Sequence, residues 1–115
     1  MHEFGVMSYL LEAVQQKALE MNAARVVTIN LVIGDRSCIM DESLSYYFDM
    51  MAEGTLAEGA TLNMRRVPTQ FLCGHCNKTY EPVEFDFSCP TCRRVGRITD
   101  EGSEFLIESI LIEKA

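Results

Sequence analysis

Four cysteines in the second half of the chain are spaced as two identical pairs. The pairs, CGHC and CPTC, are separated by twelve residues and consist of Cys73, Cys76, Cys89 and Cys92. Each C-x2-C pair can place two sulfurs on one tight turn. Two such turns facing each other supply the four thiolates that Zn²⁺ prefers. The sequence therefore predicts a structural zinc site, and because four thiolates leave no open coordination position, hydrolytic chemistry is not expected.

Two other uses of these cysteine pairs stay open. A rubredoxin-like iron site is one, although such sites generally carry glycine after the second cysteine of each pair, and here Asn77 and Arg93 stand there. A nucleic-acid-binding zinc ribbon is the other, with Arg93, Arg94 and Arg97 as a local basic patch. The net charge of −7 disfavours binding to nucleic acid, so a solvated loop is the simpler interpretation of these arginines.

Two further residues have metal-binding side chains. His75 lies inside the first cysteine pair, where it is either a turn residue or an alternative ligand that responds to pH or nickel. Cys38 has no cysteine near it in the sequence, and we expect it to be a small buried hydrophobic residue.

The chain begins Met1-His2-Glu3, and His2 is one of only two histidines. An imidazole beside deprotonated backbone amides forms a nitrogen-rich, planar donor set, which suits Ni²⁺ or Cu²⁺ and does not suit Zn²⁺. Because histidine is large, N-terminal processing is expected to leave Met1 in place. Taken alone the tripeptide is a weak motif, and chance is the simpler explanation.

The elements that must position these residues follow from hydrophobic periodicity. A helix is expected over 4–21 and a second over about 42–53, with Asp41 as its N-cap and Gly54 at its end. Strands are expected over 25–34, 60–67 and 104–113, and the last is apolar enough to be largely buried. The residues expected to face the core are Phe4, Met7, Leu10, Leu11, Val14, Ala18 and Met21 in the first helix, Val27, Ile29, Leu31 and Ile33 in the first strand, and Leu44, Tyr47, Phe48 and Met51 in the second helix.

The segment 69–98 differs from its surroundings, because it holds four of the five cysteines and too few apolar residues for a core of its own. We therefore predict an α+β fold: two helices packed on a small three-stranded sheet, with an inserted zinc-ribbon-like module. The predicted domains are an α/β nickel-binding domain formed by residues 1–68 and 99–115, and a zinc-binding module formed by residues 69–98.

Composition narrows the location of the protein. A hydrophobic fraction of 48% predicts a folded chain. No stretch approaches the ~18 apolar residues needed to cross a bilayer, and no basic segment followed by an apolar core opens the chain. We expect a cytoplasmic protein with no membrane partner, whose cysteines are thiols or metal ligands.

Several segments together resemble the HypA/HybF family of hydrogenase nickel-incorporation proteins. They are MHEFGVM, VTINLVIGDRS with its Ile-Gly-x-x-Ser turn at 33–37, SLSYYFDMMAEGT, the two cysteine pairs and SEFLIESILIE. The resemblance implies a nickel metallochaperone with Ni²⁺ as cargo, bound by the His2 imidazole and by backbone nitrogens that include those of His2 and Glu3. It also implies Zn²⁺ bound by Cys73, Cys76, Cys89 and Cys92.

The chain departs from the family pattern in its histidines. Some members carry histidines that flank the cysteine pairs, and here Asn77 and Arg93 stand there, so acid-switched zinc coordination is not expected. The fourth nickel donor stays open between the Met1 amine and His75.

The resemblance also implies partners: a HypB-like GTPase, the hydrogenase large-subunit precursor and, in some organisms, urease maturation factors. We expect no catalysis, because the sequence contains neither a P-loop nor a plausible pair of nucleophile and base. The alternative function is a zinc-ribbon adaptor that binds protein or nucleic acid.

Overall fold

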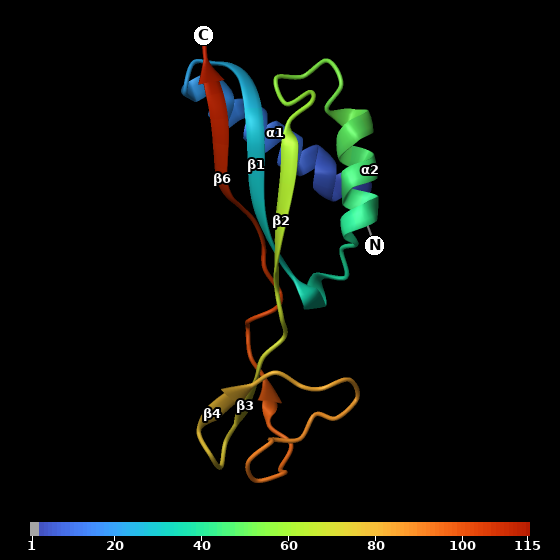
Figure 1. The fold of residues 1–115 in the computed structure, drawn as a ribbon, viewed down its shortest axis with the longest axis vertical. Helices are drawn as coiled ribbons and strands as arrows, with labels where there is room; N and C mark the ends of the chain where they lie inside the picture. Colours follow the sequence, from blue (N-terminus) through green and yellow to red (C-terminus); the bar gives the residue numbers. More distant parts are fainter. Residues whose placement is uncertain (1–2) are drawn as a thin grey trace. The chain divides into compact units, whose positions relative to one another are not determined.

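The computed structural model describes residues 3–115, which fall into two units (Figure 1). The first unit comprises Met1–Val32, Cys38–Arg65 and Leu106–Ala115, and the second comprises Ile33–Ser37 and Arg66–Phe105. Both helices and a three-stranded sheet of long strands belong mainly to the first unit, and a three-stranded sheet of short strands belongs to the second. This confirms the predicted α+β class. Within the described range, no helix is both long enough and apolar enough to cross a membrane.

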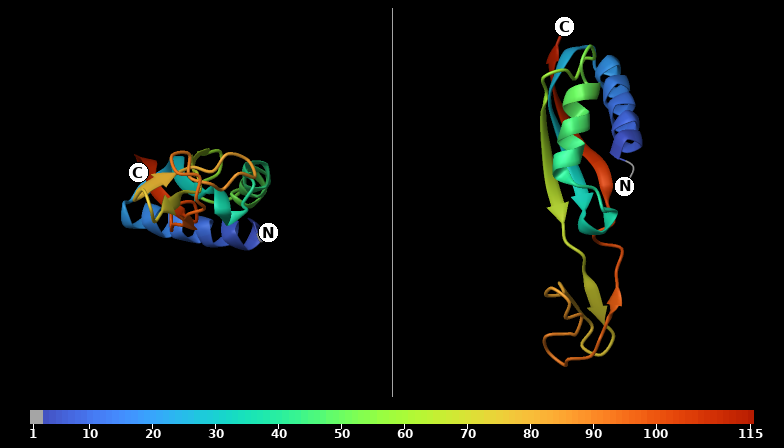
Figure 2. Two further views of the ribbon diagram at one scale, coloured as in Figure 1. Left: turned by 90° about the horizontal axis from the view of Figure 1, so that it is seen from below. Right: turned by 90° about the vertical axis from the view of Figure 1, so that its right-hand side faces the viewer.

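The first unit is built from α1 (Glu3–Glu20), β1 (Ala23–Gly34), α2 (Asp41–Met51), β2 (Thr61–Val67) and β6 (Phe105–Lys114). The strand order is β2-β1-β6, so the longest strand, β1, is central. β1 and β2 run in the same direction and are connected through α2, whereas β6 runs in the opposite direction (Figure 1). The two helices contact each other and cover one face of the sheet (Figure 2).

The core of the first unit lies between the helices and the sheet. It confirms most of the predicted inward positions, which are Met7, Leu10, Leu11, Val14, Ala18, Ile29, Leu31, Leu44 and Phe48. The prediction is wrong for Phe4 and Met21, whose side chains are 56% and 36% exposed. Phe4 is the second residue of α1 and Met21 directly follows its last residue, Glu20. The Phe4 ring instead makes an edge contact with the ring of Tyr47 on α2, with the ring centroids 5.8 Å apart.

The other face of the sheet is polar. Asn63 donates to Asn30, which in turn donates to Ser109, both at 2.9 Å, so one hydrogen-bonded row crosses all three strands. Arg25 pairs with Glu113 at 3.2 Å on the same face. This ladder identifies the solvent side of the sheet and leaves the opposite side for the helices.

The predicted alternation in β1 is wrong at its first position. Val26 is fully buried and Val27 is only half-buried, although Ile29 is buried as expected. Arg25 and Asn30 both point to the polar face although they are five residues apart. Strict alternation would place them on opposite faces, so the strand contains one extra outward residue, as in a β-bulge.

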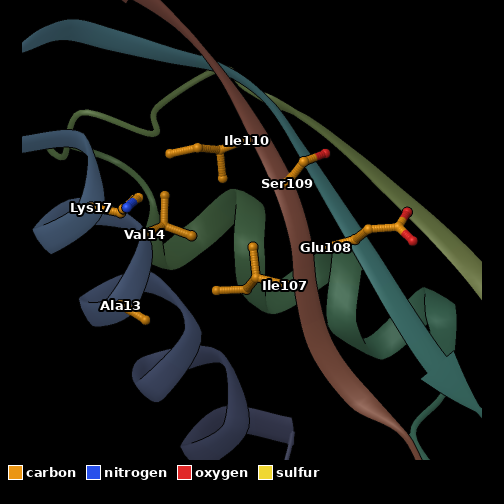
Figure 3. A pocket seen from close by; sticks show the side chains of 7 residues that line it. All are labelled: Ala13, Val14, Lys17, Ile107, Glu108, Ser109 and Ile110. Atoms are coloured by element: carbon orange, nitrogen blue, oxygen red, sulfur yellow. The ribbon is translucent and has the colours of Figure 1, made fainter. Parts of the chain in front are cut away.

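The expectation that the last strand is largely buried is also wrong. β6 is an edge strand of the sheet, and Leu106 and Leu111 are 47% and 57% exposed. Ile107 and Ile110 are half-buried and both point toward α1, across a pocket of about 260 Å³ (Figure 3). The helix α1 therefore covers one side of β6 incompletely. The apolar composition of β6 did not reveal this exposure.

Two predictions about the connection from β1 to α2 are wrong. Cys38 is exposed rather than buried and has a positive φ of 61°, while Ile39 beside it is 3% exposed and occupies the core. Asp41 is the first residue of α2, and Met40 is the N-cap, without a side-chain capping bond. An acidic residue in the first turn is still favourable, because the helix dipole is positive there.

The second unit contains η1 (Asp35–Ser37), β3 (Phe71–Cys73), β4 (Lys78–Tyr80) and β5 (Arg97–Ile98). The sheet order is β4-β3-β5 with antiparallel pairing, and these short strands were not predicted from the sequence. Gly34 passes so close to Gly102 that a Cβ atom on Gly34 would lie 2.0 Å from the Gly102 carbonyl oxygen. Only glycine fits at this crossing, which gives a physical reason for the glycine in the Ile-Gly-x-x-Ser turn.

Candidate metal centre

The second unit positions two cysteine pairs on turns with the same backbone geometry. In the first, which connects β3 to β4, the Asn77 N–H donates to the Cys73 carbonyl at 2.8 Å. In the second, the Arg93 N–H donates to the Cys89 carbonyl, also at 2.8 Å. Asn77 and Arg93 have positive φ angles of 57° and 68°. Each turn thus bends back after its second cysteine, which directs both sulfurs of the pair to one side.

The two turns bring four sulfurs together. The Sγ atoms of Cys73, Cys76, Cys89 and Cys92 all lie within 4.8 Å of one another. The Cys73–Cys92 and Cys76–Cys89 sulfur distances are 3.5 and 4.0 Å. A tetrahedron with metal–sulfur bonds of about 2.3 Å has sulfur–sulfur edges of about 3.8 Å. The spacing therefore fits a tetrahedral four-thiolate site for a metal such as Zn²⁺.

The pKa values of three thiols in the cluster are shifted in different directions. The backbone N–H of Cys92 lowers the pKa of the Cys89 thiol to about 6, and the backbone N–H of Cys76 lowers the pKa of Cys73. The pKa of Cys76 is raised to about 12, chiefly by its hydrogen bond with the Cys92 sulfur and by burial. The thiols of Cys73 and Cys89 thus ionise more readily than an ordinary cysteine, and that of Cys76 less readily. A cation bound between the sulfurs would favour the thiolate form, because it compensates the negative charge.

A small apolar cluster surrounds the sulfurs. Cys73, Cys89 and Tyr80 are buried, and Phe71 packs against them with its ring centroid 5.8 Å from that of Tyr80. Phe87 stacks on Phe71, with the ring centroids 5.6 Å apart. This cluster shields the sulfurs of Cys73 and Cys89 from solvent, and it is too small to resemble an ordinary domain core.

Tyr80 is a structural residue of this centre that the sequence did not reveal. Its hydroxyl donates to the Phe87 carbonyl at 2.7 Å and accepts from the Gly96 N–H at 2.8 Å. The hydroxyl therefore links the segments on the two sides of the second cysteine pair. A Cβ atom at position 96 would lie 2.9 Å from this hydroxyl and 2.4 Å from the Leu72 carbonyl oxygen, so glycine is required there. A lone tyrosine at the end of a short strand carries no sequence signal for such a role.

Tyr80→Phe is expected to destabilise the second unit by about 1–3 kcal/mol, because it leaves a partly buried carbonyl and a partly buried N–H without their partner. The measurement is thermal unfolding of the zinc-loaded protein, together with the rate at which a chelator removes the metal. Tyr9→Phe is the matched control, since Tyr9 lies on α1 and is 71% exposed. Equal chelation rates for the two variants would contradict the role assigned to the Tyr80 hydroxyl.

The other side chains considered for metal or nucleic-acid binding are not part of the cluster. Among the described residues, only the four cysteines form a group that could hold a metal ion in this unit, and His75 is exposed. Arg93 pairs with Asp86 at 3.4 Å, which reduces its availability for nucleic acid. Asn77 and Arg93 adopt the left-handed conformation that glycine favours, so the absence of glycine there does not by itself exclude iron.

The predicted nickel-binding residues lie at the start of the chain. Met1 and His2 are outside the described residues. Glu3 is described: it is 8% exposed, and its carboxylate accepts a hydrogen bond from the Met40 N–H at 3.4 Å. Among the described residues, Glu3 is the only charged residue that is buried. The sequence predicted a role only for its backbone nitrogen, whereas the structure adds a side-chain contact to the residue that precedes α2.

Comparisons with known proteins agree over the whole chain. A family model described as "Hydrogenase/urease nickel incorporation, metallochaperone, hypA" matches residues 1–112. Hydrogenase maturation factor HypA of Caldanaerobacter subterraneus is 39% identical over 114 residues, which cover 98% of this chain and 100% of the relative. Hydrogenase maturation factor HybF of Salmonella typhimurium is 33% identical over 113 residues, which cover 98% of this chain and 100% of the relative.

The fold is similar to solved structures as well. The solution structure of the Ni metallochaperone HypA from Helicobacter pylori has a TM-score of 0.68 at 24% identity, with full coverage of both chains. A second solution structure of a HypA protein has a TM-score of 0.71 at 24% identity and covers 97% of this chain and 96% of its own.

Proposed function

Since the chain belongs to the HypA family of nickel-incorporation metallochaperones for hydrogenase maturation, we propose that it binds Ni²⁺ at its N-terminus and delivers it to [NiFe]-hydrogenase. The observation that carries the proposal is the continuous family match over residues 1–112, which includes the Met-His-Glu start and both cysteine pairs. The nickel ligands we propose are the His2 imidazole and the backbone nitrogens of His2 and Glu3, with the Met1 amine as a further donor.

A resident Zn²⁺ held by Cys73, Cys76, Cys89 and Cys92 is the second part of the proposal. All four sulfurs lie within 4.8 Å of one another, and the sulfur–sulfur distances of 3.5 Å for Cys73–Cys92 and 4.0 Å for Cys76–Cys89 support this part of the proposal. So does the donor set, because four thiolates favour a soft or borderline cation over a hard one. In this role the zinc is structural, because a closed four-thiolate site leaves no position for substrate.

The proposed partners follow from delivery. Nickel must pass to an acceptor, so the protein docks transiently with a HypB-like GTPase and with the hydrogenase large-subunit precursor. It acts as a carrier and not as an enzyme. Delivery takes place in the cytoplasm, where a reducing environment keeps the cysteines available as metal ligands.

Deletion of this gene is expected to remove most [NiFe]-hydrogenase activity at limiting nickel, and excess nickel is expected to restore much of it. The physical reason is mass action: a free metal at high concentration can load the acceptor without a carrier. The measurement is hydrogen-dependent dye reduction across a nickel series, with the gene restored in trans as the control. Normal activity of the deletion strain at low nickel, in a host without a related gene, would contradict the proposed function.

A further inference from the structure

The turn Val83–Asp86 in the second unit presents an apolar side chain directly to solvent. Phe85 is 92% exposed, and Val83 beside it is 73% exposed. Single exposed apolar residues are common on protein surfaces. A phenylalanine that is almost entirely exposed at the tip of a turn buries little apolar area on folding, and phenylalanine is one of the residue types enriched in protein interfaces.

The backbone of this turn is also unfavourable for its sequence. Glu84 has a positive φ of 50°, in the left-handed region that costs a residue with a Cβ atom free energy and favours glycine or asparagine. The chain therefore keeps a glutamate at a position where glycine would be more stable. Local strain that is kept together with an exposed aromatic residue points to a function of the turn.

The turn is held in place by its own hydrogen bonds. Val83 and Asp86 exchange both backbone bonds, at 2.9 and 3.3 Å. The Asp86 carboxylate accepts from the Ser88 N–H at 3.1 Å and from the Ser88 hydroxyl at 2.5 Å, and it pairs with Arg93. Phe85 is thus presented on a closed turn rather than on a loose loop. Such pre-organisation lowers the entropy cost of binding.

Charge indicates what kind of surface would accept the turn. Glu81 and Glu84 are exposed on the two sides of Val83, and Asp86 follows Phe85. Of these acidic groups, Asp86 already has Arg93 as a partner. An apolar tip with acidic neighbours is complementary to an apolar pocket that has cationic side chains on its rim.

We propose that this turn is a docking site whose Phe85 inserts into an apolar pocket of a partner protein in hydrogenase maturation, with lysine or arginine on the pocket rim facing Glu81 and Glu84. The proposal rests on the proposed function, because that function names hydrogenase maturation as the process in which the partner acts. Two other occupants of the site are a lipid surface and a second copy of this chain. The acidic flanks argue against both, because they repel anionic lipid headgroups and the same turn of a second copy.

The test is hydrogenase activity at limiting nickel in a strain whose only copy of the gene carries Phe85→Ser. We expect activity to fall at least about fivefold, while the purified variant keeps the nickel and zinc content of the wild type. Leu111→Ser is the control, because Leu111 is an apolar residue of the first unit that is 57% exposed, and its activity should stay normal. Asparagine tolerates the left-handed backbone but has no charge, so Glu84→Asn should give a smaller loss of hydrogenase activity.

A photo-crosslinker in place of Phe85 identifies the partner. We expect a crosslink to a protein of the maturation machinery, in a peptide that combines apolar residues with lysine or arginine. His2→Ala in the same host tests nickel delivery separately. If His2→Ala loses activity and Phe85→Ser is normal, the docking site is wrong and delivery stands. If His2→Ala is normal, the proposed N-terminal nickel site is wrong, and delivery itself is wrong if the deletion strain is also normal at low nickel.

Two further measurements would overturn the docking site. One is Phe85-dependent co-sedimentation of the zinc-loaded protein with phosphatidylcholine vesicles, which would assign the turn to a lipid surface. The other is a Phe85-dependent dimer in sedimentation equilibrium, which would assign it to a second copy of the chain. We expect neither.

Discussion

Replacing Cys73 with alanine is expected to release the zinc and to unfold the second unit, while the first unit stays folded. The strands of the second unit have only two or three residues, and its buried cluster contains Tyr80 and the cysteines themselves. The proposed Zn²⁺ would therefore supply most of its folding free energy, which is of order 10 kcal/mol for a structural zinc site. The first unit has its own core between two helices and a sheet, so it does not depend on the metal.

The effect can be measured by the zinc content and by the amide region of the NMR spectrum of the protein. Cys38→Ala is the matched control, because Cys38 is exposed and belongs to the first unit. We expect the control to keep one zinc per chain, while Cys73→Ala loses it and gives collapsed amide dispersion only for residues of the second unit. X-ray absorption showing mainly oxygen or nitrogen around zinc in the wild type would contradict a four-thiolate site.

The cysteine cluster could be predicted because its signal is local. Each C-x2-C pair needs only one turn, and the spacing between the pairs leaves room for a connecting strand. The second sheet could not be predicted. β3, β4 and β5 are too short for any periodicity to emerge, and they lie next to the two cysteine turns and to the contacts of the Tyr80 hydroxyl, which no periodic pattern reveals.

The helices could be predicted because α1 and α2 each bury one face, and burial imposes a period of three to four residues. The errors lie where the neighbours of a residue decide its burial. Phe4 fits the periodic pattern but is 56% exposed and contacts the Tyr47 ring of α2, and β6 is apolar but occupies an edge position. Strand order and helix coverage are tertiary properties, so composition alone indicated more burial than the fold provides.

The role of the Glu3 side chain also depends on a contact between distant residues. Its carboxylate accepts a hydrogen bond from the Met40 N–H, 37 residues away in the chain. No sequence pattern predicts this pairing. It ties the first turn of α1 to the residue before α2, so the helix that follows the proposed nickel site has a defined attachment.

His2→Ala is expected to weaken nickel binding by about 100-fold or more while leaving zinc content and the fold unchanged. Loss of a residue that merely orients a metal ligand typically costs about 10–100-fold, so loss of the imidazole that anchors the metal should cost at least as much. The fold should survive because the buried side chains of α1 begin with Glu3 and Met7, and the cysteine cluster belongs to the other unit. Calorimetric titration of untagged protein with Ni²⁺ measures the effect.

Glu3→Gln is the matched control for this experiment. Glutamine keeps the backbone nitrogen, which is the expected nickel donor, and its amide oxygen can still accept from the Met40 N–H. Its effect on nickel affinity should therefore be smaller than that of His2→Ala. A form extended before Met1 separates the remaining donors: it binds nickel more weakly if the terminal amine is a ligand, and like the wild type if the nitrogens of His2 and Glu3 suffice. Unchanged affinity in His2→Ala would place the nickel site elsewhere and leave the Met-His-Glu start without a metal-binding role.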